Sequence, residues 1–299
     1  MNNNAKVSLP INQSFVNTTP DAIKKRRKHK IHLPSWATML IIFVSMLLTI
    51  AILAGACFVC PVIFAGVLIT ALLVQVIPKD NGVFEYYVRD NSIEIDGLVN
   101  EDFSGVLTIP EYIDGKPVTE IGSYAFSTTN ITEVYIPNTV TLISSYAFDN
   151  CPNLKVVHIG ENVQAINHSA FNYCPSLTTV YMGDCVEYIS SYAFAECISL
   201  ENIELSSSLS DINHGAFENC ESLKEITIPK SVTNIGADAF NGCDSLKNVY
   251  FEKTNGWEIT TTYSSDEIIL YDSSFSSDPS QAATDLTKTY VSYHWSNNQ

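Results

Sequence analysis

CESLKEITIPKSVTNIGADAF, from Cys220 to Phe240, decides the fold of this chain, because close copies of it recur at a fixed step. Searching for such self-similarity comes before any other analysis, since it identifies repeat architectures. Seven apolar columns keep a step of 23 residues over several copies. Three of them are Cys151, Cys174, Cys197, Cys220 and Cys243; Val134, Val157, Val180, Ile203, Ile226 and Val249; and Phe148, Phe171, Phe194, Phe217 and Phe240, each Phe preceded by Ala.

This repetition predicts a solenoid, because a unit of this size cannot bury its apolar side alone and must stack on its neighbours. The segment L-x-x-V-x-I suits a short parallel strand, with Leu, Val and Ile pointing inward and the residues between them pointing outward. The later segment I-x-x-x-A-F suits a tight turn, a 3-10 segment or a short strand and turn. Neighbouring units are then ~4.8 Å apart, the strand spacing of a sheet.

The pattern L-x-x-V-x-I-P…V-x-x-I-x-x-x-A-F resembles the leucine-rich repeats of BspA-like surface proteins. GVLTIPEYIDGKPVTEIGSYAF (Gly105–Phe126) is similar to the first repeat of that class, and AATDLTKTYVSYHW (282–295) is similar to the C-terminal region of its bacterial members. The resemblance covers roughly residues 84–295. It implies extracellular or surface-associated binding modules, adhesion to host or matrix proteins for some members, and no catalytic residues.

The chain divides into five segments by composition and pattern. We expect a polar, basic cytoplasmic tail (1–35), a transmembrane segment (36–77), an N-terminal cap (84–104), about six leucine-rich repeats (105–251) and a C-terminal cap region (252–299). Caps are expected because a solenoid must cover its two apolar ends. Ser and Asp are dense at 264–280, which predicts a loop there.

Residues 36–77 contain no Asp, Glu, Lys or Arg over 42 positions, which predicts membrane insertion. A span needs only ~20 residues, so two arrangements remain open. One kinked span places the repeats outside the cell, and the basic run KKRRKHK (Lys24–Lys30) favours this orientation by the positive-inside rule. A two-helix hairpin returns the repeats to the cytoplasm, as a membrane-tethered scaffold.

Charge is unevenly distributed along the 299 residues. Residues 1–78 hold seven Lys/Arg and one Asp, whereas residues 79–299 hold nine Lys/Arg and 31 Asp/Glu. An acidic repeat domain argues against a nucleic-acid partner, because phosphate binding needs a basic surface. The partners expected are therefore a protein and, through residues 36–77, membrane lipid.

The cysteines and histidines are interpreted as structural. A linear row of thiols cannot surround one zinc ion, and buried cysteine behaves as a small hydrophobe. His168 and His214 are two repeats apart, roughly 10 Å, too far to share a metal. No cofactor, metal or catalytic residue is predicted. A thiol-dependent hydrolase is the alternative from another class, and the lack of an activating histidine in the cysteine column argues against it.

The outward strand positions form two predicted rows on one exposed face, which is the candidate partner-binding surface. The first row is Glu133, Val156, Thr179, Asn202, Glu225 and Asn248, and the second is Tyr135, His158, Tyr181, Glu204, Thr227 and Tyr250. Tyrosine is enriched at binding surfaces. Cross-strand stacking of aromatic residues, without any partner, explains the second row equally well. The sequence thus predicts a non-enzymatic, membrane-anchored repeat protein that binds another protein, with adhesion at a cell surface as one such role.

Overall fold

The computed structural model describes residues 79–253, 257–261, 264–270, 278–289 and 293–297. The predicted tail (1–35) and transmembrane segment (36–77) lie outside this part of the chain. Within the described residues, no helix has the length and hydropathy needed to cross a bilayer.

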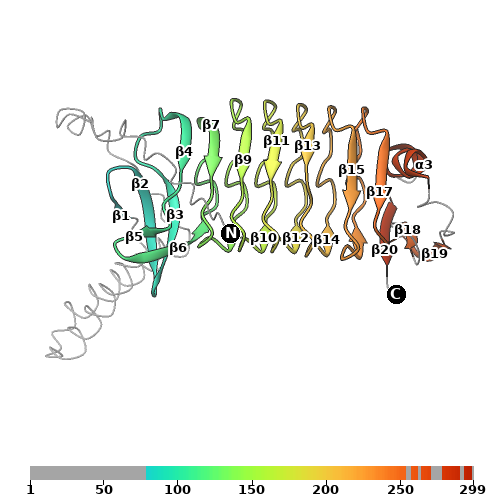
Figure 1. Cartoon of the computed structure of the whole chain (residues 1–299), viewed down its shortest axis with the longest axis horizontal. Coiled ribbons are helices and arrows are strands. Elements are labelled where there is room, and N and C mark those ends of the chain that lie inside the picture. Colours follow the sequence, from blue (N-terminus) through green and yellow to red (C-terminus); the bar gives the residue numbers. More distant parts are fainter. Residues whose placement is uncertain (1–78, 254–256, 262–263, 271–277, 290–292, 298–299) are drawn as a thin grey trace, which may run out of the picture. The chain divides into compact units, whose positions relative to one another are not determined.

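The described chain begins with antiparallel strands and continues into a parallel solenoid (Figure 1). β1 (Lys79–Asp80), β2 (Phe84–Arg89) and β3 (Ser92–Leu98) pair antiparallel in that order. β3 then pairs in parallel with β6 (Lys116–Ile121), which opens the solenoid, and β5 (Tyr112–Ile113) forms a short hairpin with β6. β2 and β3 cover the first turn of the solenoid, because their apolar residues, among them Phe84 and Ile95, are buried.

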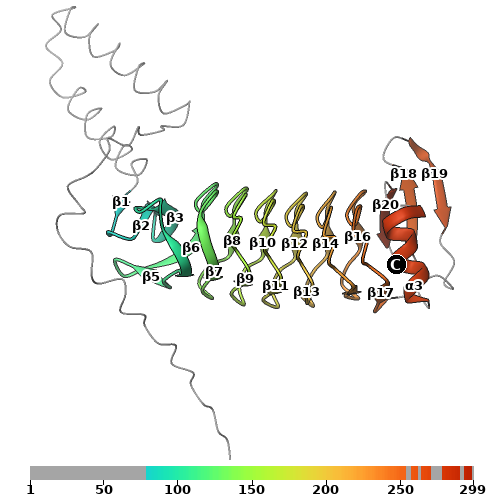
Figure 2. The same ribbon diagram turned by 90° about the horizontal axis from the view of Figure 1, so that it is seen from above.

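Each repeat contributes one strand to each of two parallel ladders, and Figure 2 shows them on opposite sides of the coil. The first ladder contains β4 (Ser104–Thr108), β7 (Asn130–Tyr135), β9 (Val156–His158), β11 (Thr179–Tyr181) and β13 (Asn202–Ile203), with β15 (Glu225–Ile228) and β17 (Asn248–Phe251) as a separate pair. The second contains β6, β8 (Leu142–Ile143), β10 (Ala165–Ile166), β12 (Tyr188–Ile189), β14 (Asp211–Ile212) and β16 (Asn234–Ile235).

The predicted parallel ladder is therefore confirmed for the L-x-x-V-x-I segments. The second segment, I-x-x-x-A-F, places its Ile in a two-residue strand and its Ala and Phe in a turn. Its register is strict: Ile166 pairs with Ile143 on one side and with Ile189 on the other. Like residues stack on like residues because the step along the chain equals one turn of the coil.

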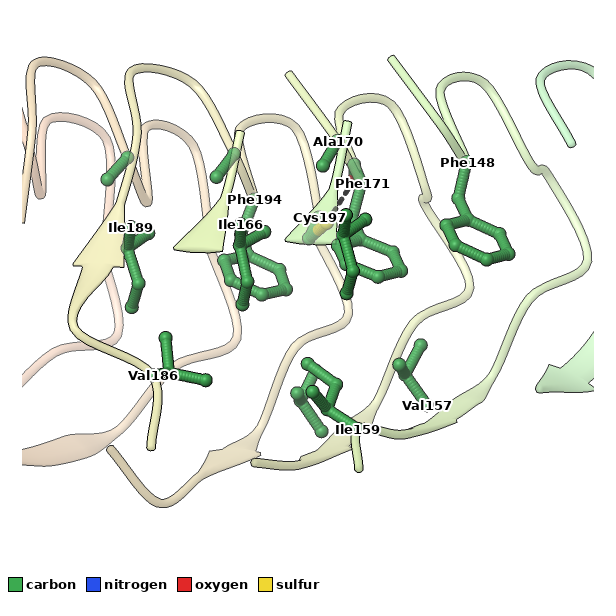
Figure 3. Packing of buried hydrophobic residues seen from close by; sticks show 14 of the residues in the cluster. Phe148, Val157, Ile159, Ile166, Ala170, Phe171, Val186, Ile189, Phe194 and Cys197 are labelled. Carbon is green, nitrogen blue, oxygen red and sulfur yellow. Dashed lines mark hydrogen bonds between the residues drawn. The ribbon is translucent and has the colours of Figure 1, made fainter. Parts of the chain in front are cut away.

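Phenylalanine rings fill the centre of the coil as a continuous stack, part of which is visible in Figure 3. Ring centroids are 5.0 Å apart for Phe148 and Phe171, 5.3 Å for Phe171 and Phe194, and 5.5 Å for Phe194 and Phe217, with interplanar angles of 3° to 4°. The Ala that precedes each Phe is buried as well, for example Ala193. The stacked rings join every repeat to the next, so stability depends on neighbouring turns.

The C-terminal segments cover the last turn. β20 (Tyr293–Asn297) pairs antiparallel with β16 and with β18 (Trp257–Thr261), and β18 pairs with β19 (Ser264–Leu270). The short helix α3 (Pro279–Thr284) packs on β17 and continues into the π-helical turn η4 (Asp285–Thr289). Trp257 and Trp295 are buried. The loop predicted at 264–280 is wrong at Ser264–Leu270, which is a paired strand, and from Pro279, where α3 begins. Residues 271–277 of this prediction lie outside the described part of the chain. The predicted boundaries of the caps stay a prediction.

Candidate binding surface

The first ladder carries the two predicted rows. Its register pairs Glu133 with Val156, Val156 with Thr179, and Thr179 with Asn202, and it pairs Tyr135 with His158 and His158 with Tyr181. Across the second, separate pair of strands, Glu225 faces Asn248 and Thr227 faces Tyr250. Because alternate residues of a strand point to opposite faces, each row lies on the outer surface above the buried Val column.

The rows are interrupted between β13 and β15, which the sequence alone did not predict. The five-stranded sheet ends at β13, and Glu204 follows the last residue of that strand. The adjoining turn changes at the same place. A Cβ on Gly183 would lie 2.4 Å from the carbonyl oxygen of Gly160, whereas the corresponding position of the next repeat holds Ser206. Ser206 has the Cβ that the two glycines lack, so the same close approach is not available between Ser206 and Gly183, on the side where β11 and β13 still pair.

Three rings of the second row form an ordered stack. The rings of Tyr135 and His158 are 4.2 Å apart at 4°, and those of His158 and Tyr181 are 4.8 Å apart at 14°. Glu133 fixes the first two rings from the neighbouring row. Its Oε1 accepts a hydrogen bond from the Tyr135 hydroxyl at 2.6 Å and lies 3.0 Å from His158 Nε2. The rings of Tyr135 and His158 are therefore held both by their stacking contact and by Glu133.

The hydrogen bonds of Glu133 shift the pKa values of both Glu133 and Tyr135. The bond from Tyr135, followed by the contact with His158, lowers the pKa of the Glu133 carboxyl below its ordinary value of 4.5. The same bond raises the pKa of the Tyr135 hydroxyl above 10.0. At neutral pH the carboxylate is thus ionised and the phenol is neutral, which is the pair of states that this hydrogen bond needs.

Two residues extend the rows and were missed in the sequence. β4 pairs with β7 so that Val106 faces Glu133 and Thr108 faces Tyr135. Val106 is an exposed apolar residue at the N-terminal end of the first row. The sequence does indicate this strand, because V-L-T-I-P at 106–110 has the spacing of the later strands. The strand was missed because the segment lacks the leading Leu of the pattern.

A second aromatic row runs along the turns that precede each Ala-Phe pair. Tyr124 stacks on Tyr146 at 4.7 Å, and Tyr192 stands between His168 and His214 with edge contacts of 5.8 Å and 5.0 Å. A tyrosine ring therefore separates the two histidines that share a repeat position. The part of the chain that the structure describes contains no group of three or more His, Cys, Asp or Glu placed to hold a metal.

The cysteine column has a specific backbone partner. Cys174, Cys197 and Cys220 each donate a hydrogen bond from Sγ, at 3.2 Å, to the carbonyl oxygen of a Phe in the preceding repeat. Figure 3 draws this bond for Cys197. Burial raises the pKa of the Cys174 and Cys220 thiols well above the ordinary value, so both stay protonated at neutral pH. The thiolate is the nucleophilic form, and these positions suppress it.

Comparison with known proteins agrees with this geometry. Residues 119–247 match, in six copies, the family model described as BspA type leucine rich repeat region. The repeat region is thus similar in its sequence and in its parallel ladders to leucine-rich-repeat solenoids. The solved structure of the pneumococcal vaccine antigen PcpA is 26% identical with a TM-score of 0.51, over 60% of this chain and 51% of that one. The chain thus spans about half the length of that antigen.

Two further bacterial structures are similar to this chain. A leucine rich repeat protein from T. pallidum is 25% identical over 56% of this chain and 90% of its own, with a TM-score of 0.49. A leucine rich cell surface protein from Faecalibacterium prausnitzii is 28% identical over 60% of this chain and 56% of its own, with a TM-score of 0.45. No curated protein matches the chain.

Proposed function

We propose that this protein is a membrane-anchored, non-enzymatic binding module that displays the strand face of its repeats to another protein. The observation that carries the proposal is the ordered stack of Tyr135, His158 and Tyr181 on the outer face of the sheet, in which Glu133 contacts the first two residues. A surface that is rigid before contact loses little conformational entropy on binding, so more of the contact energy appears as affinity.

Adhesion at a cell surface is the form of this function that the similarity to BspA-type repeats favours. The anchor proposed is the uncharged segment 36–77, and the basic run Lys24–Lys30 before it favours a repeat domain outside the cell. Protease added to intact cells that carry a C-terminally tagged protein tests this placement. Loss of the tag, with a cytoplasmic control spared, supports display outside the cell. A protected tag supports the cytoplasm-facing scaffold instead.

Site-specific photo-crosslinking tests the binding face itself. A photo-reactive residue is placed at Thr227 on the strand face or, as a control, at Tyr188, which is 45% exposed on the opposite ladder. We expect a discrete crosslinked product from position 227 that position 188 does not give, and we expect Tyr181→Ala to remove it. The same products from both positions, or none from position 227, would overturn the proposal.

A further inference from the structure

The aromatic stack of the strand face ends with one open ring face, on Tyr181. One side of this ring is covered by His158, 4.8 Å away. Among the described residues, no ring packs on its other side, because the next repeat holds Glu204 at the corresponding repeat position, one residue beyond the end of β13. The exposed fractions agree with this arrangement. Tyr181 is 57% exposed, whereas Tyr135 and His158 are half-buried.

An open tyrosine face followed by an exposed carboxylate suits a planar cation. Cations are attracted to the face of an aromatic ring, and a guanidinium can stack on the ring while its N–H groups bond a carboxylate in its own plane. The next rung lies ~4.8 Å along the coil, so a guanidinium on Tyr181 occupies the place where a further stacked ring would lie. Lysine has a compact, strongly hydrated charge and fits this arrangement less well.

The same chain shows this combination elsewhere with its own arginine. The guanidinium carbon of Arg89 lies 4.8 Å from the centroid of the Tyr87 ring, and Arg89 Nε donates to Glu94 Oε2 at 2.6 Å. A tyrosine face with a nearby glutamate therefore holds a guanidinium in this protein. At Tyr181 and Glu204 the tyrosine and the glutamate are present, and the site is open to a guanidinium from another molecule.

The charge of the surroundings favours a basic partner. Residues 79–299 carry 31 Asp/Glu against nine Lys/Arg. Glu225, exposed in the first row of the next repeat, adds a second carboxylate to the same face. Lys224 is the basic residue beside it, and its ammonium is 3.6 Å from the carboxylate of Glu201, which offsets its charge. An acidic domain also attracts a basic partner over longer distances and raises its association rate.

We propose that Tyr181 and Glu204 form a subsite for an arginine side chain of the partner protein. This inference rests on the proposed binding function and specifies the chemistry of the partner at one position. The guanidinium stacks on the open face of Tyr181, and its N–H groups donate to the carboxylate of Glu204.

The test compares two probes of equal charge, fluorescein-labelled hexa-arginine and hexa-lysine. Fluorescence anisotropy measures their dissociation constants for the full chain in nonionic detergent at about 0.15 M salt, where long-range attraction is screened. We expect hexa-arginine to bind more tightly than hexa-lysine. Tyr181→Leu weakens hexa-arginine about five- to tenfold and leaves hexa-lysine nearly unchanged. Glu204→Gln weakens hexa-arginine about threefold.

Tyr188→Leu, an exposed tyrosine on the opposite ladder, is the matched control and leaves both constants unchanged. Equal affinities for the two probes, or equal effects of Tyr181→Leu and Tyr188→Leu, would refute the arginine subsite. The crosslinking experiment separates this failure from failure of the function. A specific product at position 227 without arginine preference keeps the binding face and rejects the subsite, whereas loss of the product rejects both.

Discussion

Replacing one ring of the phenylalanine stack tests how the solenoid is held together. Phe194 is fully buried and stacks between Phe171 at 5.3 Å and Phe217 at 5.5 Å. Phe194→Ala removes a ring whose neighbours are fixed by their own repeats, so the cavity cannot close by collapse. Truncation of a buried Phe costs about 3–5 kcal/mol, and the poor collapse places this site in the upper half of that range.

The assay is urea unfolding of the full chain in nonionic detergent, followed by far-UV circular dichroism. The matched control is Tyr181→Ala, which removes an exposed ring with one stacked neighbour and is expected to cost about 1 kcal/mol or less. A loss below about 1.5 kcal/mol for Phe194→Ala would refute the argument that the stacked rings are a main source of stability.

A double-mutant cycle isolates the stacking itself. Phe171→Leu combined with Phe194→Leu keeps most of the core volume and removes a direct ring contact, so we expect a coupling free energy of about 0.5–1.5 kcal/mol. The control pair, Phe148→Leu with Phe217→Leu, spans three repeats and is expected to be additive within about 0.5 kcal/mol. Equal coupling in both cycles would mean that the effect arises from general loosening of the coil.

Three further measurements test the site and the core. Among the described cysteines, exposed Cys185 is expected to react first with a thiol reagent under native conditions, and fast labelling of buried Cys197 would contradict the structural interpretation and revive the hydrolase alternative. Because the folded pKa of Glu133 is lowered, its contribution to the free energy of unfolding is present above pH 4.5 and is lost as pH falls through the lower folded value. The difference between wild type and Glu133→Gln in urea titrations should therefore shrink from pH 7 toward about pH 3, and a constant difference would contradict this. Gly160→Ala is expected to lose about 1–3 kcal/mol in the same titration, because its Cβ would lie 2.4 Å from the carbonyl oxygen of Pro137, and a neutral result would show that the turn can move.

The repeat pattern predicted most of the core correctly, because each apolar column gives both the spacing of its residues along the chain and their burial. Leu177, Val180 and Phe171 are each buried as the alternation requires. The buried state of the cysteine column also followed from residue type, although its hydrogen bond to a carbonyl of the preceding repeat did not. That bond depends on which backbone atom of a neighbouring turn comes within reach of Sγ, and one repeat read by itself does not contain this information.

The candidate binding face was predicted less completely. The strand register aligns the residues of its two rows, and their role in binding stays a prediction. The two explanations of the aromatic row could not be separated from the sequence, since stacking and availability depend on ring orientation. In the structure, complete stacking and an open ring face belong to different residues. His158 is covered on two sides by Tyr135 and Tyr181, and Tyr181 keeps one face open.

By itself, the sequence determined the period of the coil, the identity of its core columns and the rows that face outward. These follow from the alternation of side chains along a strand and from a repeat length that equals one turn. Tertiary structure alone decided where the strand face is interrupted, between β13 and β15, and how the rings of the second row stack on one another. The physical reason is that pairing and ring stacking between neighbouring turns depend on atoms of both turns, which one repeat taken by itself does not contain.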